Sequence, residues 1–191
     1  MRFNYDIEIN SKTYYIEDNT LDLSDCQLWD SWITELSEKI IYKQALKYLY
    51  LIQNNITDKS IKNLSKSLKI IDSIVELDLS YNFIQWNSFD YLADYIINTR
   101  NLFYLNISNN SIKEENMLKL CNWIKQNTSL KEINLFNNDL TTENIKNIRD
   151  SLIINKNVEK ISINFYSLWL YAAKEFLKIF DYRNNLEIIY K

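Results

Sequence analysis

Apolar side chains recur along this chain at a fixed interval. The segment LNISNNSI at 105–112 has counterparts at 49–56, 77–84 and 133–140, each with aliphatic residues at its first, third and eighth positions. The first position holds Leu21, Leu49, Leu77, Leu105, Ile133, Ile161 and Ile189, the third Leu23, Leu51, Leu79, Ile107, Leu135 and Ile163, and the eighth Leu28, Ile56, Ile84, Ile112, Leu140 and Leu168. Aliphatic columns that hold through six periods indicate a repeated structural unit.

The hydrophobic period changes within each unit. The first part alternates apolar and polar residues, as LKYLYLIQ does at 46–53, which is typical of a strand. The second part has apolar residues three or four apart, which predicts a helix with one buried face. These faces comprise Ile61, Leu64 and Leu68, then Phe89, Leu92 and Ile96, then Met117, Leu120 and Ile124, and then Ile145, Ile148 and Leu152.

Polar residues mark the boundaries of the predicted helices. Thr57-Asp58, Glu114-Glu115 and Thr142-Glu143 offer capping groups and negative charge to the helix starts. The helices run into polar segments such as INTRN and KQNTS, where the chain can turn without glycine. Each unit therefore reads as a strand, a turn, a helix and a second turn.

The unit LxxLxLxxNxL followed by a helix resembles the leucine-rich repeat. Its 28-residue length is similar to that of the ribonuclease-inhibitor-like subfamily, and the resemblance covers roughly residues 18–185. The chain departs from the subfamily near the helix start, where the usual glycine is replaced by Trp32, Ser60, Ser88, Asn116, Asn144 and Ala172. The Asn column also changes at both ends, to Cys26 and to Tyr166.

These repeats predict an α/β fold, a horseshoe segment of a curved leucine-rich-repeat solenoid. Parallel strands pack about 4.8 Å apart whereas helices need roughly 10 Å, so the sheet lies on the concave side and the helices on the convex side. We expect a capping hairpin at 1–17, six repeats at 18–185 and a closing edge strand at 186–191.

The Asn at the sixth position of each repeated segment has a predicted structural role. Backbone groups that leave the strand become buried between stacked repeats, and an amide side chain supplies both a donor and an acceptor to them. We expect a ladder formed by Asn54, Asn82, Asn110 and Asn138.

Alternate strand residues are expected to face away from the core, onto the concave surface. Tyr, Asn and Ser with interspersed acids are typical of adaptable protein-binding surfaces, because Tyr offers contact area at low entropic cost. Four acidic residues and one basic residue on this face favour a basic partner. The predicted partner-binding residues are Asp22, Tyr48, Tyr50, Glu76, Asp78, Tyr104, Asn106, Glu132 and Phe136.

Composition narrows the function further. The chain contains no Gly and no His, which excludes glycine-dependent phosphate loops, imidazole bases and His-ligated metals, so we expect neither cofactor nor metal. A net charge of −3 without clustered Lys and Arg argues against nucleic-acid binding. The chain has no apolar run long enough to predict a membrane span. Its two Cys residues lie far apart in the sequence, which is typical of a protein in the reducing cytoplasm. A coding bias of an AT-rich genome accounts for the abundance of Asn.

The sequence therefore predicts a non-catalytic module that binds a protein partner. One alternative is a structural subunit of a cytoskeletal, ciliary or other large assembly. Another, by family analogy alone, is a regulator of a small GTPase or another enzyme. The paired carboxylates of Glu76 and Asp78 are the one candidate for acid–base catalysis in the sequence. On an open strand face both would simply ionise, whereas acid–base catalysis needs two carboxyl groups in different environments.

The last repeat is a candidate for a second contact. The segment NFYSLWLYAAKEFLKIF at 164–180 is apolar on all sides, whereas a terminal repeat normally presents a polar outer side. Trp169, Leu170 and Tyr171 are expected to meet another protein or a second copy of this chain, the alternative being a dense structural cap.

Overall fold

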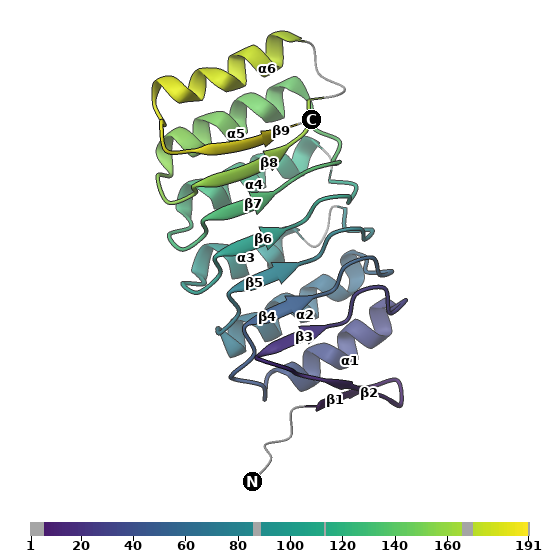
Figure 1. The fold of residues 1–191 in the computed structure, drawn as a ribbon. Helices are drawn as coiled ribbons and strands as arrows, with labels where there is room; N and C mark the ends of the chain where they lie inside the picture. The colour runs from purple at the N-terminus through teal and green to yellow at the C-terminus, as the bar shows by residue number, and fades with distance from the viewer. Residues whose placement is uncertain (1–5, 86–88, 113, 166–169, 191) are drawn as a thin grey trace.

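The computed structural model describes residues 6–85, 89–112, 114–165 and 170–190. Its main feature is a seven-stranded parallel sheet in which the strands follow one another in chain order, from β3 to β9 (Figure 1). A helix lies between each pair of consecutive strands of this sheet. None of the helices in the described segments is long and apolar enough to cross a membrane.

The elements are short and evenly spaced. The strands are β1 (Asp6–Ile9), β2 (Lys12–Tyr15), β3 (Thr20–Asp22), β4 (Tyr48–Tyr50), β5 (Glu76–Asp78), β6 (Tyr104–Asn106), β7 (Glu132–Asn134), β8 (Lys160–Ile163) and β9 (Glu187–Tyr190). The helices are α1 (Asp30–Ile40), α2 (Asp58–Ile71), α3 (Phe89–Asn98), α4 (Glu114–Gln126), α5 (Thr142–Ile154) and α6 (Leu170–Leu177), followed by the 3-10 turn η1 (Lys178–Asp181).

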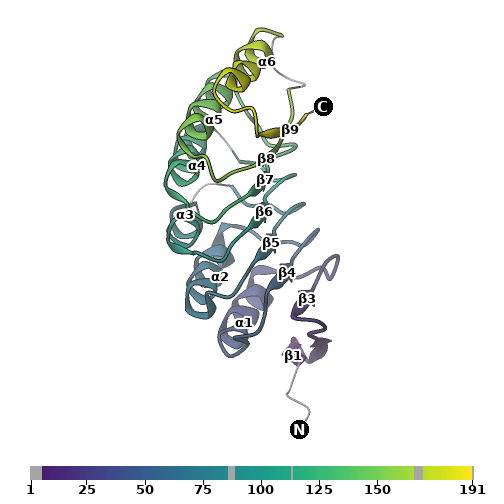
Figure 2. The ribbon, with the colours of Figure 1, turned by 60° about the vertical axis from the view of Figure 1, so that its left-hand side comes forward.

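The strand register reproduces the sequence period. Leu21 pairs with Leu49, Leu49 with Leu77 and Leu77 with Leu105, so each residue meets its counterpart in the next repeat. Because the sheet is packed more closely than the helices, the stack bends. Figure 2 shows the helices along the outer, convex side and the strands along the inner side. The predicted curved solenoid is confirmed.

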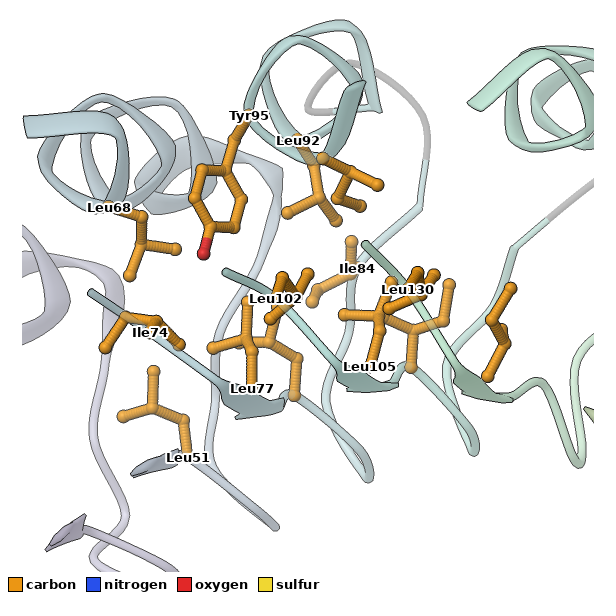
Figure 3. Close-up of a cluster of buried hydrophobic side chains, with 14 of the residues drawn as sticks. Leu51, Leu68, Ile74, Leu77, Ile84, Leu92, Tyr95, Leu102, Leu105 and Leu130 are labelled. Carbon is orange, nitrogen blue, oxygen red and sulfur yellow. The ribbon is translucent and has the colours of Figure 1, made fainter. Parts of the chain in front are cut away.

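The aliphatic columns form one continuous core between the sheet and the helices. In Figure 3, Leu77 and Leu105 of the strands point toward Leu92 and Tyr95 of α3. The described residues of all three columns are buried, apart from the last strand. Each buried Leu or Ile contributes roughly 1.5–3 kcal/mol, so every repeat is held mainly by its neighbours.

A hairpin covers the open edge of the first repeat. Strands β1 and β2 are antiparallel, and Asn10 and Ser11 form their turn with φ of 49° and 58°, the left-handed geometry that favours two-residue hairpins. Ile7 and Ile9 face the core. The backbone N–H of Asn10 donates to Oε2 of Glu35 at 3.0 Å, which fixes the hairpin to α1.

The four ladder asparagines are buried and bridge adjacent repeats in the same way. Asn82 accepts from the N–H of Ile56 at 3.1 Å and donates to the carbonyl of Leu51 at 2.9 Å, both in the preceding repeat. It also donates to the carbonyls of Leu79 and Ser80 in its own repeat at 3.1 Å each. Asn54, Asn110 and Asn138 make the equivalent pair of bonds to the repeat that precedes each of them.

The residue before each ladder asparagine has a left-handed backbone. Gln53, Tyr81, Asn109 and Asn137 have φ between 51° and 56°. Asn is among the residues that tolerate this conformation best, which explains why two Asn often stand side by side in this chain. At 109–110 and 137–138, the first Asn makes the turn and the second satisfies the buried backbone.

A second polar ladder joins the carboxyl ends of the helices. Asn127 donates to the carbonyl of Ile96 at 2.5 Å, and Asn155 donates to the carbonyls of Ile124 and Asn127. One period later, Arg183 donates to the carbonyl of Leu152 at 2.6 Å, and to those of Asn155 and Val158. These side chains satisfy carbonyls that a glycine-based cap often serves.

Polar side chains also replace glycine at the helix starts. Ser60 is fully buried and donates to Oδ1 of Asp30, one repeat earlier, at 2.6 Å. Asn144 forms a capping box with Thr141, in which each side chain bonds the other's backbone. At these two helix starts, a polar side chain that forms hydrogen bonds therefore occupies the position at which the resemblance implies glycine.

The last repeat is one residue shorter than predicted. Ile161 pairs with Ile188, whereas a 28-residue repeat would pair it with Ile189. The last strand is therefore reached after one residue fewer than in the other repeats. Leu186 still occupies the buried place of Val158, so the missing residue lies between Leu186 and β9. Ile188 packs against the core, and the assignment of Ile189 to the aliphatic column was wrong.

Replacing Asn82 with Ala should lower the free energy of unfolding by about 1–3 kcal/mol, because buried backbone groups in two repeats lose their partner. Denaturant unfolding followed by circular dichroism measures this loss. Asn55→Ala is the matched control, since the Asn55 side chain is partly exposed beside the ladder. Equal losses in the two variants would contradict a specific role for the ladder.

Arg183→Met should destabilise the last repeat by roughly 1.5–3 kcal/mol, the usual value of hydrogen bonds from a charged group. The loss should appear as faster amide hydrogen exchange in β9 than in β4. Arg100→Met, at an exposed position, is the control. If the amide hydrogens of β9 exchange at the same rate in both variants, Arg183 does not stabilise the end of the solenoid.

Candidate functional site

The concave face of the sheet carries the predicted partner-binding residues, and they differ in exposure. Asp22 is exposed, whereas Tyr48, Tyr50, Glu76, Tyr104, Glu132 and Phe136 are half-buried. Asp78 and Asn106 are buried, with 6% and 8% of their surface exposed. The face is a packed layer of side chains, of which the Tyr residues and the longer acids form the outer part.

Asp78 and Asn106 were predicted to contact a partner, and the structure shows that they are not accessible. Nδ2 of Asn106 donates to Oδ2 of Asp78 at 2.7 Å, and Ser80 donates to Oδ1 through its N–H and its hydroxyl. Strands about 4.8 Å apart bring such short polar side chains into direct contact. Their hydrogen bonds run across the sheet, so these two residues support the face without presenting a binding group.

Tyr50 and Glu76 are joined across β4 and β5. The Tyr50 hydroxyl donates to Oε2 of Glu76 at 2.8 Å. Burial, and then this hydrogen bond to a carboxylate, raise the pKa of Tyr50 to about 12. The pair holds the ring in one orientation, which lowers the entropy lost when a partner packs against it.

Tyr104 is held at the centre of the same surface. Burial, and then the charge of Asp78, raise the pKa of Tyr104, while a hydrogen bond with Asn134 opposes this rise. Tyr104 pairs with Glu76 on one side and Glu132 on the other in the strand register. An aromatic side chain is therefore placed between two acids.

Fewer carboxylates on the face are free to contact a partner than its composition indicates. Nζ of Lys160 lies 3.5 Å from Oε2 of Glu132, so this acid has a cation beside it. The Asp78 carboxylate is buried, and that of Glu76 accepts from Tyr50. Asp22 is the one exposed acid among the four predicted, so its carboxylate is the most accessible one for direct contact with a basic partner.

Comparison with known proteins agrees with this geometry. Residues 126–146 match the family model described as Leucine Rich repeat. A solved structure titled "Leiomodin-1 Actin-Binding Site 2 (ABS2)" superposes with a TM-score of 0.63, covering 74% of this chain and 82% of that chain at 15% identity. The chain has the fold of a leucine-rich-repeat protein. No curated protein sequence matches it.

The leucine-rich-repeat face does not form an acid–base pair. Glu76 and Asp78 share the face, but each carboxylate is occupied by a neighbouring Tyr, Ser or Asn side chain. Among the described residues, no three His, Cys, Asp or Glu side chains group as a metal site would require. Burial raises the pKa of the Cys121 thiol to about 11, which keeps it protonated and poorly nucleophilic.

The second predicted contact is only partly covered by the described residues. Trp169 lies outside the described residues, and Leu170 and Tyr171 begin α6, where their side chains are not described. Farther along, Phe176 is fully buried, and its ring centroid lies 5.7 Å from that of Phe165. The self-association of this repeat therefore stays a prediction.

Sequence reasoning missed a group of exposed aromatic residues at the carboxyl ends of the strands. Trp29, Tyr81 and Phe83 are 58%, 54% and 55% exposed. They stand outside the alternating part of the repeat, so the strand pattern did not select them. The signal was Tyr81, an aromatic residue at a position that the adjacent repeats fill with Gln53 and Asn109.

The Tyr50 pKa generates a prediction for alkaline pH. A folded-state pKa above the ordinary value of about 10 means that the native state holds its proton more tightly than the unfolded state. The contribution of this group to the free energy of unfolding is fully present below pH 10 and is lost as the pH rises toward 12. Tyr50→Phe should reduce this loss, measured by urea unfolding at pH 9, 10, 11 and 12. Tyr42→Phe, at an exposed position, should leave the profile unchanged.

Proposed function

We propose that this chain is a non-catalytic module that binds a protein partner on the concave face of its solenoid. The observation that carries the proposal is the ordered aromatic and acidic layer on β4 to β7, in which Tyr50 is bonded to Glu76 and Tyr104 lies between two acids. The leucine-rich-repeat fold supports it, because such solenoids present extended concave surfaces. We also propose assignment to the ribonuclease-inhibitor-like subfamily, on the strength of the regular strand register.

The chemistry of the face indicates which partner it would accept. Tyr48 and Tyr104 offer ring surface for apolar contact, and Tyr and Trp are enriched among residues that dominate binding energy. Glu76 and the exposed Asp22 would meet Lys or Arg side chains at the side toward β3. The preferred partner is thus a folded protein with a convex, mildly basic surface.

Actin is a rational first test ligand. The leiomodin-1 structure that shares this fold is titled as an actin-binding site. Since the likeness at 15% identity concerns the fold, actin is tested on this chain directly. Co-sedimentation of the purified protein with actin filaments, and its elution with actin monomers on a sizing column, examine the two forms of actin.

A structural role within a larger assembly is the second candidate function. It is favoured by the exposed aromatic residues away from the concave face, of which Trp29, Tyr81 and Phe83 are all more than half exposed. A subunit surrounded by neighbours would use several surfaces at once. A protein that stays soluble and monomeric when purified alone favours the free binding module instead.

The double variant Tyr48→Ala, Tyr104→Ala should abolish partner capture while the fold remains intact, because it removes the ring surface from the face and leaves both ladders in place. Affinity purification from the source cell, with bound proteins identified by mass spectrometry, measures the effect. Each truncation should cost at least tenfold in affinity if these are dominant contacts.

Tyr42→Ala is the control, since Tyr42 is a 78% exposed tyrosine in the turn after α1. The same proteins should be recovered with this variant as with the unchanged chain. Recovery that persists in the Tyr48→Ala, Tyr104→Ala double variant would move the binding surface away from the concave face.

A further inference from the structure

A groove of about 400 Å³ crosses the carboxyl ends of β3 to β6, at the edge of the concave face. Four successive repeats line it with the residue at the same position of each unit, namely Asp25, Gln53, Tyr81 and Asn109. Gln27, Asn55, Phe83 and the ladder residues Asn54 and Asn82 also line it. None of these residues belongs to the concave-face surface proposed above, so the groove is a site separate from that face.

Tyr81 is the unexpected residue in this groove. Its φ of 56° lies in the left-handed region, which is unfavourable for a bulky side chain. The other groove residues at this position are polar and bond within the column. Gln53 donates to Asp25 at 3.3 Å, and Asn109 accepts from Asn137 of the next repeat at 2.7 Å. An Asn at position 81 would suit both the backbone and these neighbours.

The ring of Tyr81 has no role in the core to justify this strain. The side chain is 54% exposed, and Phe83, two residues later, is 55% exposed. Residues held in an unfavourable backbone conformation concentrate at binding sites, where the placement of the side chain is used. Here the left-handed turn that the repeats share places one of two exposed aromatic rings along a groove that is otherwise lined by amides and one acid.

The shape of the groove fits a linear chain. Four strands about 4.8 Å apart span roughly 14 Å, the length of about four residues of extended polypeptide at about 3.3 Å each. The amides of Gln53 and Asn55 can supply both donors and acceptors to a peptide backbone. Aromatic rings beside such groups suit a proline or a branched aliphatic side chain.

The charge of the groove selects the partner further. Of the residues that the structure places along it, Asp25 is the one that carries a charge, and it is exposed. Its carboxylate accepts from Gln53 and retains capacity to accept from a ligand. The whole chain carries −3, which adds a weak attraction for cations.

We propose that this groove binds an extended peptide segment of a partner, with Pro or an aliphatic residue between Tyr81 and Phe83 and with Lys or Arg at Asp25. Backbone groups of the segment bond the amides of Gln53 and Asn55. The site acts beside the concave face and does not depend on it.

A bacteriophage-displayed library of random short peptides tests the proposal on the full chain. Selected peptides should combine Lys or Arg with Pro, Val, Leu or Ile within about four residues, the span of the groove. Synthetic versions are then titrated by fluorescence anisotropy. The double variant Tyr81→Asn, Phe83→Ser should weaken binding at least tenfold, as expected for loss of two aromatic contacts. Asp25→Asn should weaken binding by a smaller factor, and this factor should be larger at low salt than at high salt.

Two controls separate this site from the concave face and from loss of folding. Tyr81→Asn should fold at least as well as the unchanged chain, which thermal unfolding verifies, because Asn tolerates the left-handed backbone. Tyr48→Ala, Tyr104→Ala should leave the peptide affinity within about twofold, since these rings lie outside the groove. Lack of selected peptides, selection of acidic ones, equal binding by Tyr81→Asn, Phe83→Ser, or loss of binding in Tyr48→Ala, Tyr104→Ala would each overturn the proposal.

Discussion

Backbone groups buried between stacked repeats must find hydrogen-bond partners, and the architecture of this chain follows from that constraint. The strands are short, so their pairing satisfies only a small part of each repeated unit. The remaining groups are served by side chains that reach into the preceding repeat, such as Asn82 at the end of β5 and Asn155 after α5. Each of these bonds joins neighbouring units, so the polar ladders and the aliphatic core hold the same interfaces.

The lack of glycine makes this dependence on side chains more visible. Tight turns and helix ends usually use glycine, which adopts left-handed angles without steric cost. This chain uses Asn and Gln in the left-handed turns, and small polar residues such as Ser60 at the helix starts. At the end of the solenoid a cation, Arg183, performs the bonding that Asn performs elsewhere. A positive group near a helix carboxyl end is also favoured by the helix dipole.

The close spacing of the strands shapes the binding surfaces as well. Short polar side chains on the concave face bond one another across the sheet, as Asp78 and Asn106 do, and leave recognition to the longer Tyr and Glu residues. Such a face is rigid before a partner arrives, which limits the entropy lost on binding. At the strand ends the same repetition lines up residues of four units along one groove, where a single strained Tyr interrupts the polar column.

The sequence alone determined the repeat, the register of every strand before the last, and the role of the core. Apolar residues one period apart must stack if they are to be buried together, so the pairing of Leu49 with Leu77 and the buried face of α2 could be predicted. The tertiary structure decided which outward residues are accessible, because the burial of Asp78 depends on its neighbour Asn106 in the next strand. It also decided the closing register, since Ile188 and Ile189 are equally apolar and only packing distinguishes them. The groove at Tyr81 arises from four repeats placed side by side, a proximity that a linear pattern does not express.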